Sequence, residues 1–186
     1  MANIILASSS PRRQELLTQL GLDFDIFSPD VDETVQENES VTDYVERLAR
    51  HKAQVVLSQF PSAIVIAADT SLSVNDQIIG KPASKQHAFE IWSQLSGQWH
   101  DVYSGICVAT SEQVLSQVVR TRVEFQQLSQ IEMEKYWATG EPIGKAGAYA
   151  IQGIAAQYIP QIKGSYSNVV GLLLHEIAQL LESVKA

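Results

Sequence analysis

The strongest constraint on the fold is an unbroken apolar run, Ala63-Ile64-Val65-Ile66-Ala67-Ala68, which is followed by Asp69-Thr70. A run that is apolar at every position indicates a strand with both faces covered. Helices must therefore pack on each side of the sheet that contains this strand. The run predicts an α/β protein with this strand at its centre and with Asp69 at the strand's carboxyl end, where α/β sheets bind their ligands.

The remaining patterns predict a mixed sheet, because they combine crossover helices with hairpins. Expected strands span residues 4–7, 24–28, 71–74, 77–79, 99–110 and 114–126, with Asn75-Asp76 as one hairpin turn. The first expected helix runs from Ser10 to about Gly21, and the second begins near Ser40. Two more span residues 84–97 and 129–139, and a last one follows Gly171-Leu172. No repeat or linker interrupts these elements, so we expect one domain over residues 1–186.

Composition excludes several classes of protein. Thirteen basic and 21 acidic residues give a net charge of −8, which argues against general binding to duplex nucleic acid. No apolar run reaches the roughly 18 residues of a membrane helix, and the first residues lack a signal-peptide pattern. The single cysteine, Cys107, is expected in a buried strand. We therefore expect a cytoplasmic protein without a membrane partner, and we expect its three tryptophans to pack in the core.

The segment Ser8-Ser9-Ser10-Pro11-Arg12-Arg13 is the first candidate site. Two arginines in the first turn of a helix oppose the helix dipole, which favours negative charge there. Their placement makes sense if an anion binds across the turn, held by backbone N–H groups, serine hydroxyls and guanidinium groups. The alternative is that both arginines pair with acids such as Glu15. No Walker A pattern is present.

Asp69 and a few scattered charges form the second group of candidates. Asp69 suits a divalent cation or a reacting water, and it equally suits hydrogen bonds from a following turn. Asp32-Glu33 is a possible metal-binding pair within an acidic stretch that also fits a solvated loop. Lys52, Lys81 and Lys145, each taken alone, fit solvated surface charges.

Five blocks, in this order, resemble those of the Maf family of nucleoside triphosphate pyrophosphatases. The resemblance covers nearly the whole chain, and its first and fourth blocks are long and specific. The blocks are Ala7-Ser8-Ser9-Ser10-Pro11-Arg12-Arg13-Gln14-Glu15-Leu16-Leu17, Ala68-Asp69-Thr70, Gly80-Lys81-Pro82, Lys145-Ala146-Gly147-Ala148-Tyr149-Ala150-Ile151-Gln152-Gly153 and Gly164-Ser165-Tyr166-Ser167-Asn168-Val169-Val170-Gly171-Leu172.

The resemblance implies a fold, a reaction and a set of site residues. The fold is two-lobed and similar to that of inosine triphosphate pyrophosphatases, with a long mixed sheet, flanking helices and a cleft. The reaction splits a nucleoside triphosphate into the monophosphate and pyrophosphate with a divalent cation, Mg²⁺ or Mn²⁺. Asp69 is implied as general base and, with Glu33, as metal ligand. The implied substrate-binding residues are Ser8, Arg12, Arg13, Lys52, Thr70, Lys81, Lys145 and Gln152, of which Arg12, Thr70 and Gln152 align with positions that set base choice.

Within the family, the segment Tyr149-Ala150-Ile151-Gln152-Gly153 resembles the branch that acts on dTTP and UTP. Modified pyrimidine nucleotides are further candidate substrates under this expectation. The alternatives are a 7-methyl-GTP pyrophosphatase and a non-catalytic nucleotide-binding regulator of septum formation. Gly144 and Leu173 depart from the family pattern, which has an acid and a proline there, and Gly144 bears on how Lys145 is oriented. A homodimer is a family expectation.

Overall fold

The computed structural model describes residues 3–75 and 77–185, and the predicted turn residue Asp76 lies outside them. Within these residues a mixed sheet of seven strands has the order β2-β1-β3-β5-β6-β7, with β4 also paired to β3. β1 runs parallel to β2 and β3, and the other pairs are antiparallel. The predicted mixed α/β class is therefore confirmed. The strands are β1 (Ile4–Leu6), β2 (Asp25–Ile26), β3 (Ile64–Val74), β4 (Gln77–Ile79), β5 (Trp99–Ala109), β6 (Val114–Glu124) and β7 (Gln161–Lys163).

The helices begin at the predicted serines. Ser40, Ser84 and Ser129 each accept a hydrogen bond from the backbone N–H three residues on, which stabilises the first turn. Ser10 stands at the same position of α1, but its side chain makes no such bond. The helices are α1 (Pro11–Thr18), α2 (Val41–Gln59), α3 (Lys85–Leu95), α4 (Gln130–Ala138), α5 (Tyr166–Val170) and α6 (Leu174–Lys185), with 3₁₀ turns at Ala146–Ala148 and Ile154–Tyr158.

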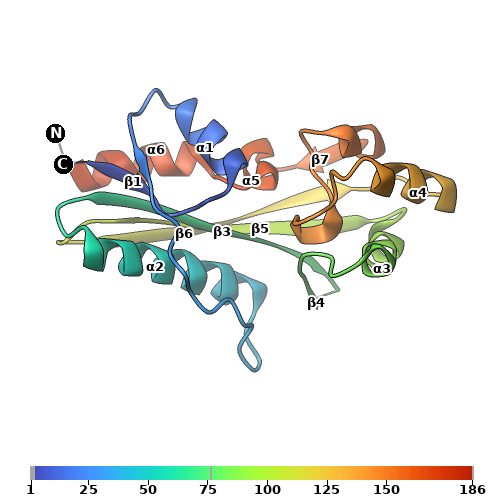
Figure 1. The fold of residues 1–186 in the computed structure, drawn as a ribbon, viewed down its shortest axis with the longest axis horizontal. Coiled ribbons are helices and arrows are strands. Elements are labelled where there is room, and N and C mark those ends of the chain that lie inside the picture. The colour runs from blue at the N-terminus through green and yellow to red at the C-terminus, as the bar shows by residue number, and fades with distance from the viewer. Residues whose placement is uncertain (1–2, 76, 186) are drawn as a thin grey trace.

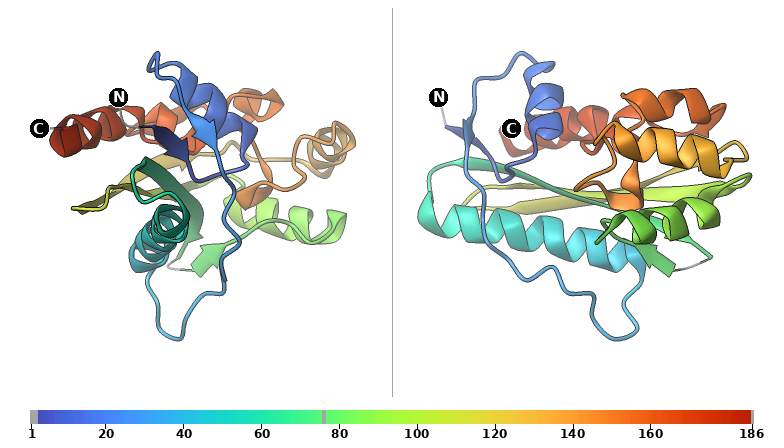
Figure 2. Two further views of the ribbon diagram at one scale, coloured as in Figure 1. Left: turned by 60° about the vertical axis from the view of Figure 1, so that its left-hand side comes forward. Right: turned by 45° about the vertical axis from the view of Figure 1, so that its right-hand side comes forward.

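Helices cover both faces of the central strand β3, as its apolar run predicts. Side chains alternate along a strand, so Val65 and Ala67 face α2, where Ala49, Ala53 and Val56 meet them. Ile64, Ile66 and Ala68 face the larger core, which includes residues of α1, α3, α4 and α6. Figure 1 shows α2 on one side of the long sheet and α1, α5 and α6 on the other, and both views of Figure 2 keep this separation.

A glycine on β5 lets α2 pack directly on the sheet. Gly105 pairs with Asp69 across the β3–β5 ladder. A Cβ atom at Gly105 would lie 2.4 Å from the carbonyl oxygen of Val45, so any side chain would push α2 away. The close approach holds the inner face of α2 against the middle of β3.

One prediction about β3 is wrong, because the strand does not end at Asp69. It continues to Val74, since β5 pairs with it from Val65 through Ser73 and β4 pairs with its last three residues. On the edge opposite β5, β1 pairs only as far as Ile66 and β4 begins at Leu72. Asp69 and Thr70 therefore lie at a gap between two short strands, β1 and β4, next to the carboxyl end of β1.

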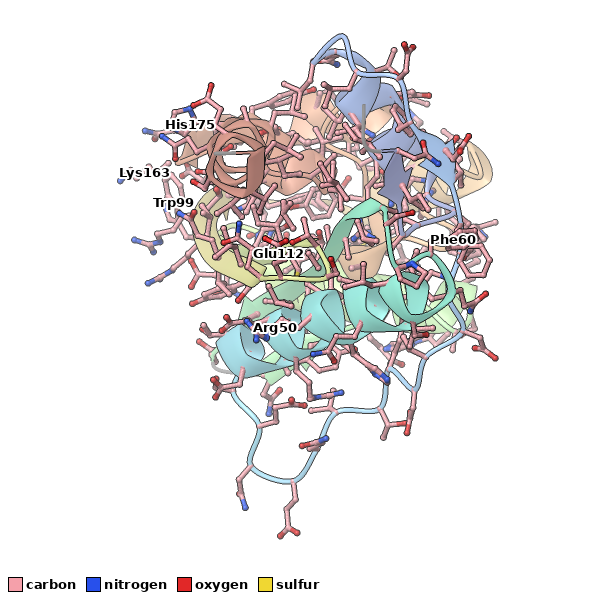
Figure 3. All side chains as sticks on the ribbon, turned by 90° about the vertical axis from the view of Figure 1, so that its left-hand side faces the viewer. Arg50, Phe60, Trp99, Glu112, Lys163 and His175 are labelled. Atoms are coloured by element: carbon pink, nitrogen blue, oxygen red, sulfur yellow. The ribbon has the colours of Figure 1, made fainter. Side chains whose placement is uncertain are left out.

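Smaller differences concern short elements and tryptophans. β2 is shorter than the predicted strand, α1 ends at Thr18, and β7 and α5 were not predicted. Trp92 is buried as expected, but Trp99 is only partly buried, beside Lys163 in Figure 3. The Lys163 ammonium lies 4.7 Å and the Arg122 guanidinium 5.3 Å from the centre of the Trp99 ring. None of the helices in residues 3–75 and 77–185 has the length and apolarity needed to cross a membrane.

Candidate active site

A cleft of about 910 Å³ opens at the gap in the edge of β3. This volume suits a small-molecule ligand. The cleft is lined from one half of the molecule by the β1–α1 turn, residues 28–33 and α2, and from the other half by residues 80–81 and 141–153. Both halves contribute, as the predicted two-lobed arrangement requires. The structure brings all ten predicted site residues to this cleft: Ser8, Arg12, Arg13, Glu33, Lys52, Asp69, Thr70, Lys81, Lys145 and Gln152.

Lys52 joins the two predicted metal ligands. Its ammonium lies 2.7 Å from Asp69 Oδ1 and 2.6 Å from Glu33 Oε1. Asp69 points to the α2 face because it follows Val65 and Ala67 at a spacing of two, and Lys52 lies on the inner face of α2. Lys52 and Asp69 are each only 8% exposed, so the interpretation of Lys52 as a solvated surface charge is wrong.

The charges around Glu33 keep it ionised. Burial alone would raise the pKa of its carboxyl group. The hydrogen bond and charge of Lys52, followed by the charges of Lys81 and Arg13, outweigh burial and hold the pKa below its ordinary value. Glu33 is therefore an anion at neutral pH, and it lies in a cationic part of the cleft and not in a merely solvated loop.

Arg13 is held by neutral groups and leaves its charge to the cleft. Its Nε donates to the carbonyl oxygen of Gly171 at 2.9 Å, and its terminal nitrogens donate to Ser8 Oγ at 3.3 Å and Thr70 Oγ1 at 3.4 Å. Burial lowers the pKa of the Arg13 guanidinium, and the nearby charge of Asp69 partly opposes this effect. A guanidinium stays protonated at neutral pH even so. Among the described residues Arg13 has no ion-pair partner, which favours the anion-binding interpretation over pairing with an acid.

Arg12 lies beside it and is partly exposed. Burial lowers the pKa of Arg12, while the charge of Glu15 raises it. Glu15 lies near enough for this effect, and it also lines the cleft. The alternative in the sequence analysis is that both arginines pair with acids such as Glu15. It holds in part for Arg12, which lies near Glu15, and it does not hold for Arg13.

Several supporting residues were missed by the sequence analysis. Thr70 Oγ1 lies 2.7 Å from Ser104 Oγ, which donates to the carbonyl oxygen of Asn168, so Thr70 is fixed to the segment that carries Gly171. Tyr44 donates to the carbonyl oxygen of Glu33 at 2.9 Å. Burial, with the charges of Asp69 and Glu33, raises the pKa of Tyr44 to about 12. The position of Tyr44 eight residues before Lys52 on one helix face was the signal that could have found it.

The three remaining candidates lie at the rim. Lys81 is exposed after β4 and lowers the pKa of Glu33 by its charge. Lys145 donates to the carbonyl oxygen of Glu141, which orients its side chain although Gly144 stands where the family has an acid. The Gln152 side chain is exposed in the cleft and makes no hydrogen bond to the residues that the structure describes. An amide that lacks an internal partner is free to contact a ligand.

The donor set fits a hard divalent cation that arrives with phosphates. No group of three or more histidine, cysteine, aspartate or glutamate side chains within the described ranges could hold a metal ion alone. Mg²⁺ commonly takes one or two protein carboxylates and completes its shell with phosphate oxygens and water. Glu33 and Asp69, on either side of one ammonium, supply such a pair.

The family model and the sequence relatives cover nearly the full chain. The family model described as "Maf-like protein" matches residues 3–184. The dTTP/UTP pyrophosphatase of Acinetobacter baylyi is 69% identical over 97% of this chain and 99% of its own length. The dTTP/UTP pyrophosphatase of Colwellia psychrerythraea is 49% identical over 96% of this chain and 86% of its own length. A solved structure, the dITP/XTP pyrophosphatase of Mycobacterium abscessus, is 15% identical with a TM-score of 0.48, over 97% of this chain and 94% of that one.

Proposed function

This chain belongs to the Maf family, and from that premise we propose that it hydrolyses dTTP and UTP to the nucleoside monophosphate and pyrophosphate. The observation that carries the proposal is the cleft itself. It combines a nearly buried carboxylate, Asp69, with five basic side chains in a protein of net charge −8. A concentration of cations against the overall charge suits a polyanion such as a triphosphate.

The phosphates are proposed to bind between the two halves of the cleft. Arg13 offers a guanidinium fixed by three hydrogen bonds, and Ser8 supplies a hydroxyl beside it. Arg12, Lys81 and Lys145 add positive charge along the rim. Fixed cations that already lie in place need no rearrangement when charge develops on the leaving pyrophosphate, and this pre-organisation is where catalysis gains most.

Asp69 is proposed to accept a proton from the attacking water. The water attacks the α-phosphorus, the anhydride bond between the α- and β-phosphates breaks, and pyrophosphate leaves with the electron pair of that bond. Lys52 holds Asp69 through the bond to Oδ1. The second carboxylate oxygen, which this bond does not engage, is the one we assign to the water.

A divalent cation, held by Glu33 and Asp69, would neutralise charge on the phosphates when bound. Lys52 contacts one oxygen of each carboxylate, so its ammonium lies between the two groups that would hold the cation. Gln152 is proposed to contact the base, because its amide both donates and accepts and so matches a uracil or thymine edge. A cytoplasmic location and a homodimer stay predictions.

A panel of nucleotides tests the proposal. The chain is incubated with Mg²⁺ or Mn²⁺ and dTTP, UTP, CTP, GTP, ATP or 7-methyl-GTP, and pyrophosphate release is measured. We expect dTTP and UTP to be the best substrates. Preference for 7-methyl-GTP would support the other branch of the family, and absence of pyrophosphate from every nucleotide would leave the non-catalytic regulator.

A further inference from the structure

The loop that carries Gln152 is held from behind by Glu141. The Glu141 carboxylate accepts from Ile154 N at 2.8 Å and from Ala155 N at 3.1 Å, directly after Gln152-Gly153. Its Oε1 also accepts from the hydroxyl of Tyr136 at 2.7 Å. The free backbone N–H groups at the start of the 3₁₀ turn are thus satisfied by one side chain that also lines the cleft.

Tyr136 completes the hold on the other side of Gln152. Its hydroxyl accepts from Ala150 N at 3.3 Å while donating to Glu141. The ring is fixed by contacts with Trp92 and Tyr158, whose ring centres lie 5.2 and 5.8 Å away. Backbone amides two residues before and two residues after Gln152 are therefore bound to the same Tyr136–Glu141 pair.

Gly153 shows how tightly the loop lies against this pair. A Cβ atom at Gly153 would lie 2.1 Å from Glu141 Oε2 and 2.8 Å from Oε1. The φ angle of Gly153 is −112°, so a left-handed backbone does not explain the glycine. The glycine is needed because the carboxylate occupies the space that a side chain would take.

The same glutamate also reaches the phosphate side of the cleft. Its carbonyl oxygen accepts from the Lys145 ammonium. Burial would raise the pKa of the Glu141 carboxyl group, but the bonds from Ile154, Tyr136 and Ala155 and the charge of Lys145 hold that pKa below its ordinary value. An ionised carboxylate makes stronger hydrogen bonds than a neutral acceptor, so the loop is firmly held at neutral pH.

We propose that Glu141 is a positioning residue for base recognition. Together with Tyr136 and Gly153 it fixes the Gln152 loop in the position where the Gln152 amide contacts a pyrimidine base. This inference rests on the proposed function, because it names what controls substrate choice at that same cleft. A loop free to move would let the amide meet several base edges, and discrimination would fall because the wrong base no longer leaves polar groups unpaired.

Three variants test this clamp, by which we mean the hold of Glu141 and Tyr136 on the Gln152 loop, and each does so in a different way. Glu141→Gln removes the charge, Tyr136→Phe removes the shared hydroxyl and keeps the ring, and Gly153→Ala displaces the carboxylate without removing it. Glu112→Gln is the matched control, since Glu112 lies in the β5–β6 turn outside the cleft lining, where Figure 3 labels it. The measurements are kcat/KM for dTTP, UTP and GTP, the melting temperature, and amide hydrogen exchange at residues 154 and 155.

We expect the preference for dTTP over GTP to fall by about tenfold in Glu141→Gln and Gly153→Ala, and by less in Tyr136→Phe. Amide exchange at 154 and 155 should quicken in the same variants, and Glu112→Gln should match wild type in every measurement. An unchanged preference, with a lower melting temperature or with all substrates equally slowed, overturns the inference. If Glu141→Gln does not fold, Tyr136→Phe decides.

The two proposals fail differently. A wild-type chain that hydrolyses none of these nucleotides refutes the proposed function. Hydrogen exchange then still tests the clamp, because this measurement does not depend on turnover. The clamp predicts slow exchange at residues 154 and 155 in wild type and faster exchange at both in Glu141→Gln. Fast exchange at both amides in wild type would refute the clamp whatever the activity.

Discussion

Replacing Lys52 by methionine should destabilise the protein far more than replacing an exposed lysine of equal ion-pair geometry. Lys52 and Asp69 are both 8% exposed, and removing one partner of a buried pair leaves an uncompensated charge. The cost is expected to be about 3 kcal/mol, at the low end for such pairs because the Glu33 side chain is 46% exposed and water relieves it. Methionine keeps the length of the stem, so lost packing contributes little.

The control is Lys85→Met. Lys85 lies 2.6 Å from Glu134, but the two side chains are 48% and 47% exposed. An exposed pair of this kind contributes less than about 1 kcal/mol. Urea unfolding at pH 7 measures both variants against wild type, and equal losses for Lys52→Met and Lys85→Met would refute the reasoning from burial.

The Lys52 effect should also depend on pH. The pKa of Glu33 in the folded protein lies below its ordinary 4.5, so its contribution to stability is complete above that value and is lost as pH falls through the folded pKa. Lys52→Met removes the main attraction that lowers this pKa. The gap between wild type and variant should therefore narrow below pH 4.5, and a gap of constant size from pH 7 to pH 3 would contradict the electrostatic cause.

Three further substitutions test two other site residues and the packing of α2 on the sheet. Arg13→Ala should lower kcat/KM for dTTP by about 10²-fold, with KM raised and kcat reduced, because a fixed guanidinium acts on both bound substrate and transition state; steady-state kinetics that match wild type would speak against it. Gln152→Glu should weaken dTTP and UTP more than GTP, because an ionised carboxylate cannot donate to a pyrimidine edge, whereas a uniform drop would mean that Gln152 only shapes its loop. Gly105→Ala should cost about 2 kcal/mol in urea unfolding, because its Cβ would lie 2.4 Å from the Val45 carbonyl oxygen, and an unchanged midpoint would show that α2 can move aside.

The elements that the sequence predicted well are those with a strong local signal. The apolar run before Asp69 predicted a strand covered on both faces, and Ser40, Ser84 and Ser129 marked three helix starts. β7 and α5 carry no comparable signal, because three- and five-residue elements are too short for a period to show. The end of β3 depended on pairing with β5 and β4, which no local pattern contains.

In the candidate site, too, some features were predictable from the sequence and others were not. The resemblance named residues that line one cleft, but it did not predict how they contact one another. Lys52 follows Leu48 and Ala49 at helical spacing, so a local signal for its burial was present, but the carboxylates that pair with it, Asp69 and Glu33, lie far from it in sequence. Glu141 was passed over because a single glutamate before a proline carries no local signal, and its role becomes visible only when the amides of Ile154 and Ala155 fold back on it.

Product analysis by ³¹P NMR tests the central claim most directly. Wild type and Asp69→Asn are incubated with dTTP and Mg²⁺, and the phosphorus species are followed over time. Wild type should yield dTMP and pyrophosphate. Asp69→Asn should fold with a lower melting temperature, because among the described residues the Lys52 ammonium keeps only Glu33 as its ion-pair partner, and it should be slower by about 10²- to 10⁴-fold at a temperature where it is folded. Release of dTDP and phosphate by wild type, or undiminished turnover in Asp69→Asn, would contradict the account.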